Sequence, residues 1–355
     1  MHRTLWLVLL ISVIVMRILF YSKNQYVYSD GIAIRIRDTV TSEPLRLERS
    51  QYLILKGYKI YLPRYPEINY GDNLIVEGVV DGDNLEEVKL IDCSSSDGIL
   101  ISIRNKLMQF FQRSLPARHA GLVAGVVLGS KDGIDDCFWE ELKKSGTVHV
   151  VVASGMNVSI VAGFLISLFA LFMSRRRAIP FVLVGIWLYS ILSGFDAPLV
   201  RASIMGSIAF TAQELGKLYY AGRALVITAA LMVFIKPEWI FDLGFILSFV
   251  ATASILLIEE PIKNKLVLIP GILRSDLSAT LSAQLGVAPI LYASFGQFNI
   301  LSPLYNVSVL WTIPIITLIG MISGIISFMC VPLATLILYL TYPFTSWFIF
   351  CTTYM

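Results

Sequence analysis

The segment from Leu142 to Phe172 places the tightest constraint on how this chain can fold. It begins with charged residues and continues as an apolar run about as long as a transmembrane helix, which needs about 20 apolar residues. Within the apolar part lie His149, the Ser154-Gly155 pair and Asn157. Polar groups are costly in hydrocarbon unless they face a cavity or another helix. We therefore predict an interrupted segment that lines a cavity.

The rest of the chain has the composition of an integral membrane protein. Of its residues 56% are hydrophobic and 15% are charged, whereas a soluble domain carries about 25% charged residues. The net charge of +3 does not by itself indicate a nucleic-acid binder. Further apolar runs cover approximately residues 178–194, 199–213, 224–240, 242–258, 276–293, 300–328 and 330–351.

The positions of the cations between these runs predict one orientation. Because cytoplasmic loops are rich in Lys and Arg, the side that carries most of them is assigned to the cytoplasm. Lys236 is the main exception. We predict a multi-pass protein of the bacterial plasma membrane with a cytoplasmic N-terminus. The cations assigned to the cytoplasmic side are Arg3, Arg175, Arg176, Arg177, Lys217, Arg223, Lys263, Lys265 and Arg274.

Two N-terminal domains are predicted before the main bundle. Residues 1–24 form a transmembrane anchor, because the apolar run Leu5–Phe20 is followed by no small-residue cleavage site. Residues 25–98 show the short alternating runs of β-strands, as in Ile32–Ile36 and Leu74–Val80. About five strands and little helix favour a small extracytoplasmic β-barrel of the OB type. OB-folds often bind single strands, but a structural or assembly role is equally open.

Residues 99–140 are predicted to connect this barrel to a polytopic α-helical transmembrane domain at 141–355. The connector contains an amphipathic helix over Ile101–Leu115, which Pro116 ends. We expect the helix to lie at the membrane interface, or alternatively to pack on the barrel as a soluble helix. Its predicted apolar side is Leu107, Met108, Phe110 and Phe111, and its predicted polar side is Arg104, Lys106 and Arg113.

The sequence offers no motif for a soluble-type enzyme, and we predict neither a metal nor a cofactor. The three histidines, His2, His119 and His149, lack ligand spacing. An intramembrane serine protease usually has glycine two residues before its serine, and Val152 stands there. Glycine-rich residues near position 129 do not match a phosphate-binding loop. A disulfide between Cys93 and Cys137, both predicted to lie outside the membrane, stays open.

Several polar or ionisable residues lie within or at the ends of apolar runs. Each alone has an ordinary explanation as a helix-end residue or as an interhelical hydrogen bond. Together they predict a polar path through a helical bundle. With the Ser154-Gly155 pair, the candidate residues are His149, Ser154, Gly155, Asn157, Arg201, Arg223, Asp242, Gln284 and Asn306.

Short motifs around these residues recur in order from about residue 120 to about residue 325. They are Leu128-Gly129; Ser145 to His149 with Ser154-Gly155; Gly194 to Met205 with Arg201-Ala202; Gly222-Arg223-Ala224; Asp242 to Phe249; and Leu281 to Leu285 with Pro289, Phe295-Gly296 and Asn306. This series resembles the ComEC-type competence proteins, bacterial inner-membrane channels that import single-stranded DNA during natural transformation. The chain departs from the family at Asn157, where His is common, and at Ile246, where Gln is common.

The resemblance implies a DNA channel without enzymatic activity of its own. Arg201 and Arg223 would contact phosphates, and His149 and Asn157 would shape a constriction, because a polyanion needs a wet, locally cationic lining. Expected partners are single-stranded DNA, membrane lipid, a DNA-receptor protein outside and a helicase-like motor inside. The sequence ends at Met355 without the family's metallo-β-lactamase-like domain, so either a separate nuclease is expected or the chain is incomplete. Homo-oligomerisation stays open. The alternatives are a transporter of another anionic or lipid-linked solute, and a non-conducting membrane scaffold.

Overall fold

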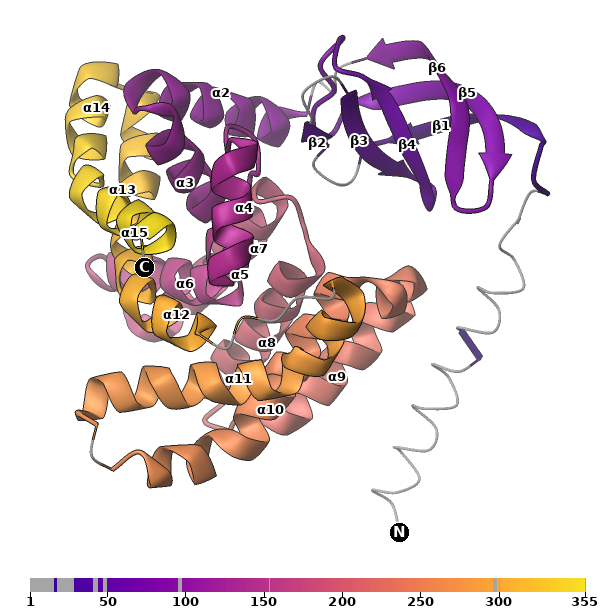
Figure 1. Ribbon diagram of the computed structural model, residues 1–355. Coiled ribbons are helices and arrows are strands. Elements are labelled where there is room, and N and C mark those ends of the chain that lie inside the picture. Colours follow the sequence, from indigo (N-terminus) through magenta and orange to yellow (C-terminus); the bar gives the residue numbers. More distant parts are fainter. Residues whose placement is uncertain are drawn as a thin grey trace.

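A computed structural model describes residues 16–17, 29–40, 44–46, 50–94, 98–152, 154–267, 269–295, 299 and 301–354. The predicted anchor therefore lies outside the described residues, except for Met16 and Arg17. The described chain forms a small N-terminal sheet followed by a larger helical part, and the sheet lies beside the helices next to the start of α2 (Figure 1).

The N-terminal sheet has six strands in the order β1-β5-β6-β4-β3-β2. Its neighbouring strands are antiparallel except for β4 and β6, which are parallel. Alternate residues point to one side and form a single core, to which Ile36, Leu53, Ile60, Val76 and Leu85 each contribute from a different strand. The strands are β1 Ala33–Thr39, β2 Leu45–Arg46, β3 Ser50–Leu55, β4 Tyr58–Pro63, β5 Asn73–Asp81 and β6 Asn84–Ser94.

The OB-like barrel predicted from the sequence is not shown, because this sheet is not closed. Its edge strands, β1 and β2, do not pair with each other in the part of the chain that the structure describes. The sheet nevertheless bends around its one core, and β5 and β6 shift register near Gly78. A Cβ on Gly78 would lie 2.8 Å from the Glu86 carbonyl oxygen. Glycine at this position thus permits a close approach of the two strands.

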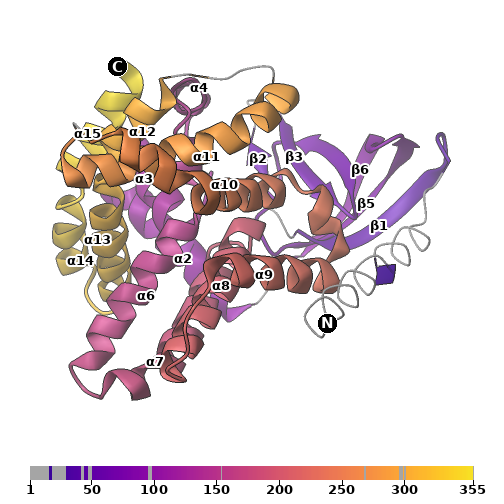
Figure 2. The same ribbon diagram turned by 90° about the horizontal axis from the view of Figure 1, so that it is seen from below.

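The helical part consists of α2 and the helices that follow it, with α10 and α11 side by side (Figure 2). Their order agrees with the predicted apolar runs, although the runs 300–328 and 330–351 are each divided into two α-helices and the run 224–240 ends in a 3-10 helix. The elements are α2 Ile99–Ser114, α3 Ala117–Leu128, α4 Asp136–Ser145, α5 Val148–Val151, α6 Gly155–Ala170, α7 Arg175–Leu192, α8 Ala197–Glu214, α9 Ala221–Ile235, the 3-10 helix η1 Pro237–Phe241, α10 Leu243–Lys265, α11 Gly271–Phe295, α12 Ser302–Leu310, α13 Thr312–Ser327, α14 Val331–Tyr339 and α15 Tyr342–Tyr354.

Two segments of the described chain, Val148–Ala170 and Leu243–Lys265, are long and apolar enough to cross a membrane. Two bent pairs of helices would each add a further span if the two helices of a pair together cross the membrane once. The pair α12 and α13 is bent by 44°, and the pair α14 and α15 by 45°. The structure is therefore that of a mostly helical protein with two to four candidate membrane spans.

The segment from Leu142 to Phe172 is interrupted, as predicted. Helix α4 ends where Gly146 adopts a left-handed conformation with φ of 72°, which glycine adopts without steric cost. The short helix α5 follows and ends at Val152, whose backbone is extended. Helix α6 begins at Gly155 after the extended Ser154. The apolar segment thus has one break just before the Ser154-Gly155 pair.

Helix α2 packs within the helical part. The prediction that Arg104 lies on its polar side is wrong, because the residue is buried. This side chain is only 4% exposed. It donates hydrogen bonds of 2.6 Å from Nη1 to the carbonyl oxygens of Leu128 and Leu192, the last residues of α3 and α7. The guanidinium also lies 5.5 Å from the ring centroid of Tyr70, in the turn before β5. A positive charge at two helix C-termini is electrostatically favourable.

Gly320 and Gly324 pack α13 against α2 and α3. A Cβ on Gly320 would lie 2.6 Å from Val127 Cγ2, and one on Gly324 would lie 2.9 Å from Leu107 Cδ2. Both glycines therefore allow the helix backbones to approach closely, as small residues do at helix interfaces.

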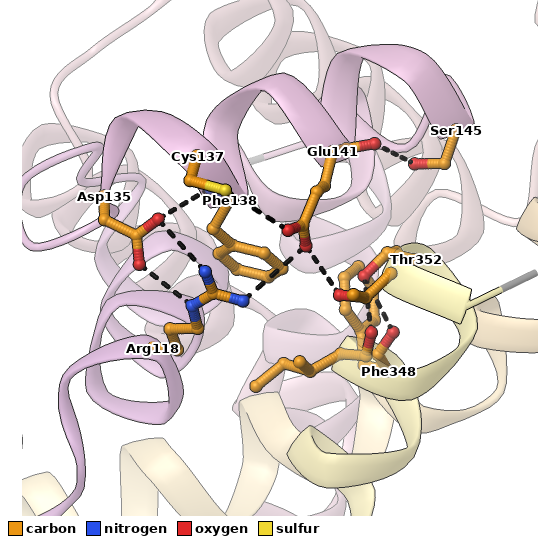
Figure 3. Close-up of polar contacts among 10 residues, drawn as sticks. Arg118, Asp135, Cys137, Phe138, Glu141, Ser145, Phe348 and Thr352 are labelled. Atoms are coloured by element: carbon orange, nitrogen blue, oxygen red, sulfur yellow. Dashed lines mark hydrogen bonds and ion pairs between the residues drawn. The ribbon is translucent and has the colours of Figure 1, made fainter.

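A polar network holds α4 on α3 and α15, and thereby positions the turn that leads into α5 (Figure 3). The Arg118 Nε atom lies 3.0 Å from Asp135 Oδ2, and its Nη1 atom lies 3.7 Å from Glu141 Oε2. The Thr353 hydroxyl of α15 donates to Glu141 at 2.6 Å. The Cys137 thiol faces Glu141 Oε1 at 3.5 Å.

Candidate functional site

The break in the apolar segment brings Gly155 against Arg201. A Cβ on Gly155 would lie 3.1 Å from Arg201 Nη2 and 3.2 Å from Ala202 Cβ, so α6 and α8 meet closely where α6 begins. From the other side, α10 supplies two hydroxyl groups. Arg201 Nε donates to Ser248 Oγ and Nη1 donates to Thr252 Oγ1, each at 2.6 Å. We call Gly155, Arg201, Ser248 and Thr252 the arginine cluster.

The arginine cluster carries a positive charge that no acidic side chain in the described part of the chain balances. Among the described residues, no carboxylate lies within ion-pair distance of Arg201, which donates to the two hydroxyls of α10 and to the Met205 sulfur. The guanidinium is half-buried and lies beside the first residue of α6. The N-terminal end of a helix carries a partial positive charge. Both contributions favour an anion over a cation at this place.

Asn157 lies on α6 near the break, but its side chain faces α3 and α7. It is fully buried, and its Nδ2 donates to the Val126 carbonyl oxygen at 2.8 Å. Its Oδ1 has no hydrogen-bond partner among the described residues. The structure therefore separates Asn157 from the arginine cluster, although the two are neighbours in sequence.

Gln284 and Asn306 belong to a second polar group around the turn between α4 and α5. Gln284 Nε2 donates to the Asn299 carbonyl at 3.0 Å, and Asn299 Nδ2 donates to the Lys144 carbonyl at 2.5 Å. Asn306 is 3% exposed, and its Nδ2 lies 3.4 Å from Ser302 Oγ. Asn299 thereby joins α11 to the end of α4, and Ser302 Oγ of α12 donates to the Gly146 carbonyl oxygen at 3.5 Å.

The other predicted site residues do not join either group. Arg223 is exposed at the start of α9, where its guanidinium lies 4.5 Å from the Tyr220 ring. Asp242 caps α10, because its Oδ1 accepts a 2.7 Å hydrogen bond from the Phe245 N–H. His149 is exposed on α5, and Ser154 precedes α6 without capping it through its side chain.

Ser248 and Thr252 were not predicted as site residues. They are four residues apart and so lie on one face of α10. Ser248 also lies inside the motif Asp242 to Phe249, which is part of the family resemblance. Two hydroxyl residues on one helix face could each accept a hydrogen bond from Arg201, which is the single arginine of α8. Their spacing is therefore the signal from which they could have been found. The buried position of Arg104 was also missed, because a buried arginine is rare and no local pattern marks one.

The described residues contain no group of three or more His, Cys, Asp or Glu side chains that could hold a metal ion. The thiols of Cys93 and Cys137 are free. Burial, together with the nearby carboxylates of Asp72 and Asp92, raises the pKa of the Cys93 thiol. Cys93 is therefore less reactive than an exposed thiol.

The apolar helices of the interrupted bundle are compatible with a membrane protein, and the cationic cluster at the break favours an anion. The chain belongs to the Competence protein family, whose model matches residues 126–355. It is 25% identical over 250 residues to ComE operon protein 3 of Bacillus subtilis (strain 168), an alignment covering 68% of this chain and 31% of that protein. It is 26% identical over 282 residues to an uncharacterized protein of Aquifex aeolicus (strain VF5), covering 74% and 62%.

The chain thus spans less than two thirds of the length of either relative. No solved structure shows significant similarity to it. The family membership confirms the resemblance seen in the sequence motifs, and it is consistent with a role in DNA uptake.

Proposed function

We propose that this protein is a multi-pass channel of the bacterial plasma membrane that imports single-stranded DNA during natural transformation. The observation that carries the proposal is the arginine cluster at the break before α6, in a chain of the Competence family. In this proposal a phosphate oxygen of the DNA pairs with Arg201, which has no carboxylate partner among the described residues. The partners proposed from the resemblance are a DNA receptor outside and a cytoplasmic motor.

The distribution of charge supports contact with DNA in the bundle more than on the sheet. Residues 26–98 contain eight Lys or Arg and thirteen Asp or Glu, a net charge of −5, whereas residues 141–355 contain twelve and eight, a net charge of +4. Non-specific binding of nucleic acid depends on neutralising phosphates with cations. In this proposal the extracytoplasmic β domain, whether an OB-like barrel or an open sheet, serves mainly in assembly.

The uptake of labelled DNA tests the proposed function directly. In a strain that lacks the gene for this protein, labelled double-stranded DNA should still bind the cell surface but should not enter the cytoplasm. Complementation with the intact gene should restore entry. Equal entry with and without the protein would contradict the proposal, and loss of surface binding would point to a receptor role instead.

Two other functions stay in competition. A transporter of another anionic or lipid-linked solute would use the same cationic cluster, and a scaffold would not conduct at all. Normal entry of DNA in the deletion strain, with loss of export or import of another anion, would favour the transporter.

The charge of the β domain leads to a first quantitative prediction. Purified residues 26–98 should bind a 30-nucleotide oligo(dT) too weakly to detect at about 150 mM salt, because net negative charge repels a polyanion and aromatic stacking alone is about 1–3 kcal/mol per base. Fluorescence anisotropy measures the binding, and a single-stranded-DNA-binding protein is the positive control. Tight binding that falls steeply with salt would show that the sheet receives the DNA.

A further inference from the structure

An apolar groove runs along α8 and is lined by residues of α7, α8, α9 and η1. It has a volume of about 460 Å³, which lies within the range of about 300–1,000 Å³ that small-molecule sites occupy. Its floor is buried and consists of Val200 and Ile204 of α8 and Met232 of α9. On its rim, Leu231 is 43% exposed and Ile235 is 62% exposed. The groove is thus an open apolar channel on the side of the bundle.

The groove has the length of an extended hydrocarbon chain. Its lining residues on α8 extend from Val200 to Thr211, a distance of about 16 Å along a helix that rises about 1.5 Å per residue. The indole nitrogen of Trp187 donates to Ser207 Oγ at 3.3 Å, so these two polar groups of the lining are paired with each other. A polar ligand would lose its hydration in the groove without recovering hydrogen bonds there. An acyl chain has nothing to lose in this way.

One end of the groove carries two opposite charges. Trp239 of η1 lines this end, and Lys236 Nζ lies 5.9 Å from the centroid of its ring. Lys236 Nζ also lies 3.7 Å from Glu238 Oε2, and both side chains are about half exposed. An exposed ion pair at this distance contributes little to stability, so each partner can pair with a ligand instead. This end therefore complements a ligand that carries one anionic and one cationic group.

We propose that the groove binds an acyl chain of a zwitterionic phospholipid with a primary ammonium group, such as phosphatidylethanolamine. Its phosphate pairs with Lys236 and its ammonium group with Glu238, while the chain lies along α8 over Val200 and Ile204. Trp239 fits the level of the headgroup, where tryptophan is enriched in membrane proteins. A phospholipid with a net negative charge would place its uncompensated charge beside Glu238, and is therefore disfavoured.

The lipid site also gives a role to Lys236, the main exception to the charge distribution that predicts the orientation of the chain. A lysine that pairs with a lipid phosphate is favourable on either side of a membrane. The inference goes beyond DNA import and does not depend on it, because it follows from the lining of the groove and the charges at its end.

Quenching by brominated lipids tests the site, because Trp187 and Trp239 line the groove. Phosphatidylethanolamine or phosphatidylglycerol with dibrominated acyl chains is added to the purified full chain in detergent, and tryptophan emission is measured. Half-maximal quenching should need an about fivefold lower concentration of phosphatidylethanolamine. Trp187→Phe and Trp239→Phe should each reduce this headgroup-dependent quenching, whereas Trp311→Phe, outside the groove, should not. Equal quenching by the two lipids, or a preference for phosphatidylglycerol, would overturn the proposal.

Two sets of variants test the acyl chain and the headgroup separately. Ile208→Phe fills the groove and should abolish the headgroup-dependent quenching, whereas Ile227→Phe, on an exposed face of α9, should retain it. Lys236→Gln and Glu238→Gln should each reduce the preference for phosphatidylethanolamine to less than about twofold. If Ile208→Phe and Ile227→Phe are quenched alike, the chain does not lie in the groove. If both charge variants keep the wild-type preference, the assignment of the headgroup is wrong.

Discussion

Replacing Arg201 by alanine should reduce the entry of labelled DNA by about 10- to 100-fold, because a charge-assisted hydrogen bond contributes about 1.5–3 kcal/mol and each 1.4 kcal/mol is a factor of ten. The variant removes the only charged side chain of the arginine cluster. Surface binding of DNA should not change. The measurement is the ratio of internalised to bound label, taken at equal abundance of the protein in the membrane.

Two further variants make this result specific. Arg201→Lys keeps the charge but loses the forked contact with Ser248 and Thr252, so its uptake should lie between those of the wild type and Arg201→Ala. Arg223→Ala removes an exposed arginine that stacks on Tyr220 outside the cluster, and it should retain most uptake. Unchanged entry in Arg201→Ala, or an equal loss in Arg223→Ala, would refute the role of the cluster.

Replacing Arg104 by methionine should destabilise the protein by about 3–5 kcal/mol, the range found when one partner of a buried charged contact is removed. The side chain of methionine fills part of the space, but it leaves the carbonyl oxygens of Leu128 and Leu192 without their donor. The expected observation is a lower unfolding midpoint and a lower abundance in the membrane.

Arg113→Met is the matched control for this prediction, since Arg113 lies exposed on the same helix. It should change stability by less than about 0.5 kcal/mol, as surface substitutions usually do. If Arg104→Met and Arg113→Met unfold with the same midpoint, Arg104 does not hold the ends of α3 and α7.

Much of the fold could be predicted because its signals are local. The alternation of Ile34 and Ile36 with Arg35 and Arg37 predicted a strand, and the structure contains one. The apolar runs predicted the helices from α7 onwards. Closure of the sheet could not be predicted in the same way, because pairing between edge strands depends on contacts far apart in sequence and leaves no periodic pattern.

The sequence predicted some residues of the candidate site, but it did not predict which side chains those residues contact. Gly155 and Arg201 were both identified, yet only the structure brings them together with Ser248 and Thr252. Asp242 had a simple capping role that the sequence already allowed. Arg104 shows why the polar side of a helix cannot be inferred from charge alone: an arginine is buried where helix ends supply its acceptors.

The contact between Tyr70 and Arg104 has a mechanical consequence. The turn around Tyr70 and Gly71 rests on the first turns of α2, where Gly71 meets Ile101 and the Tyr70 ring lies over the guanidinium. That guanidinium also holds the ends of α3 and α7. A displacement of the sheet would therefore press on α2 at both Ile101 and Arg104, and through Arg104 it would also reach the ends of α3 and α7.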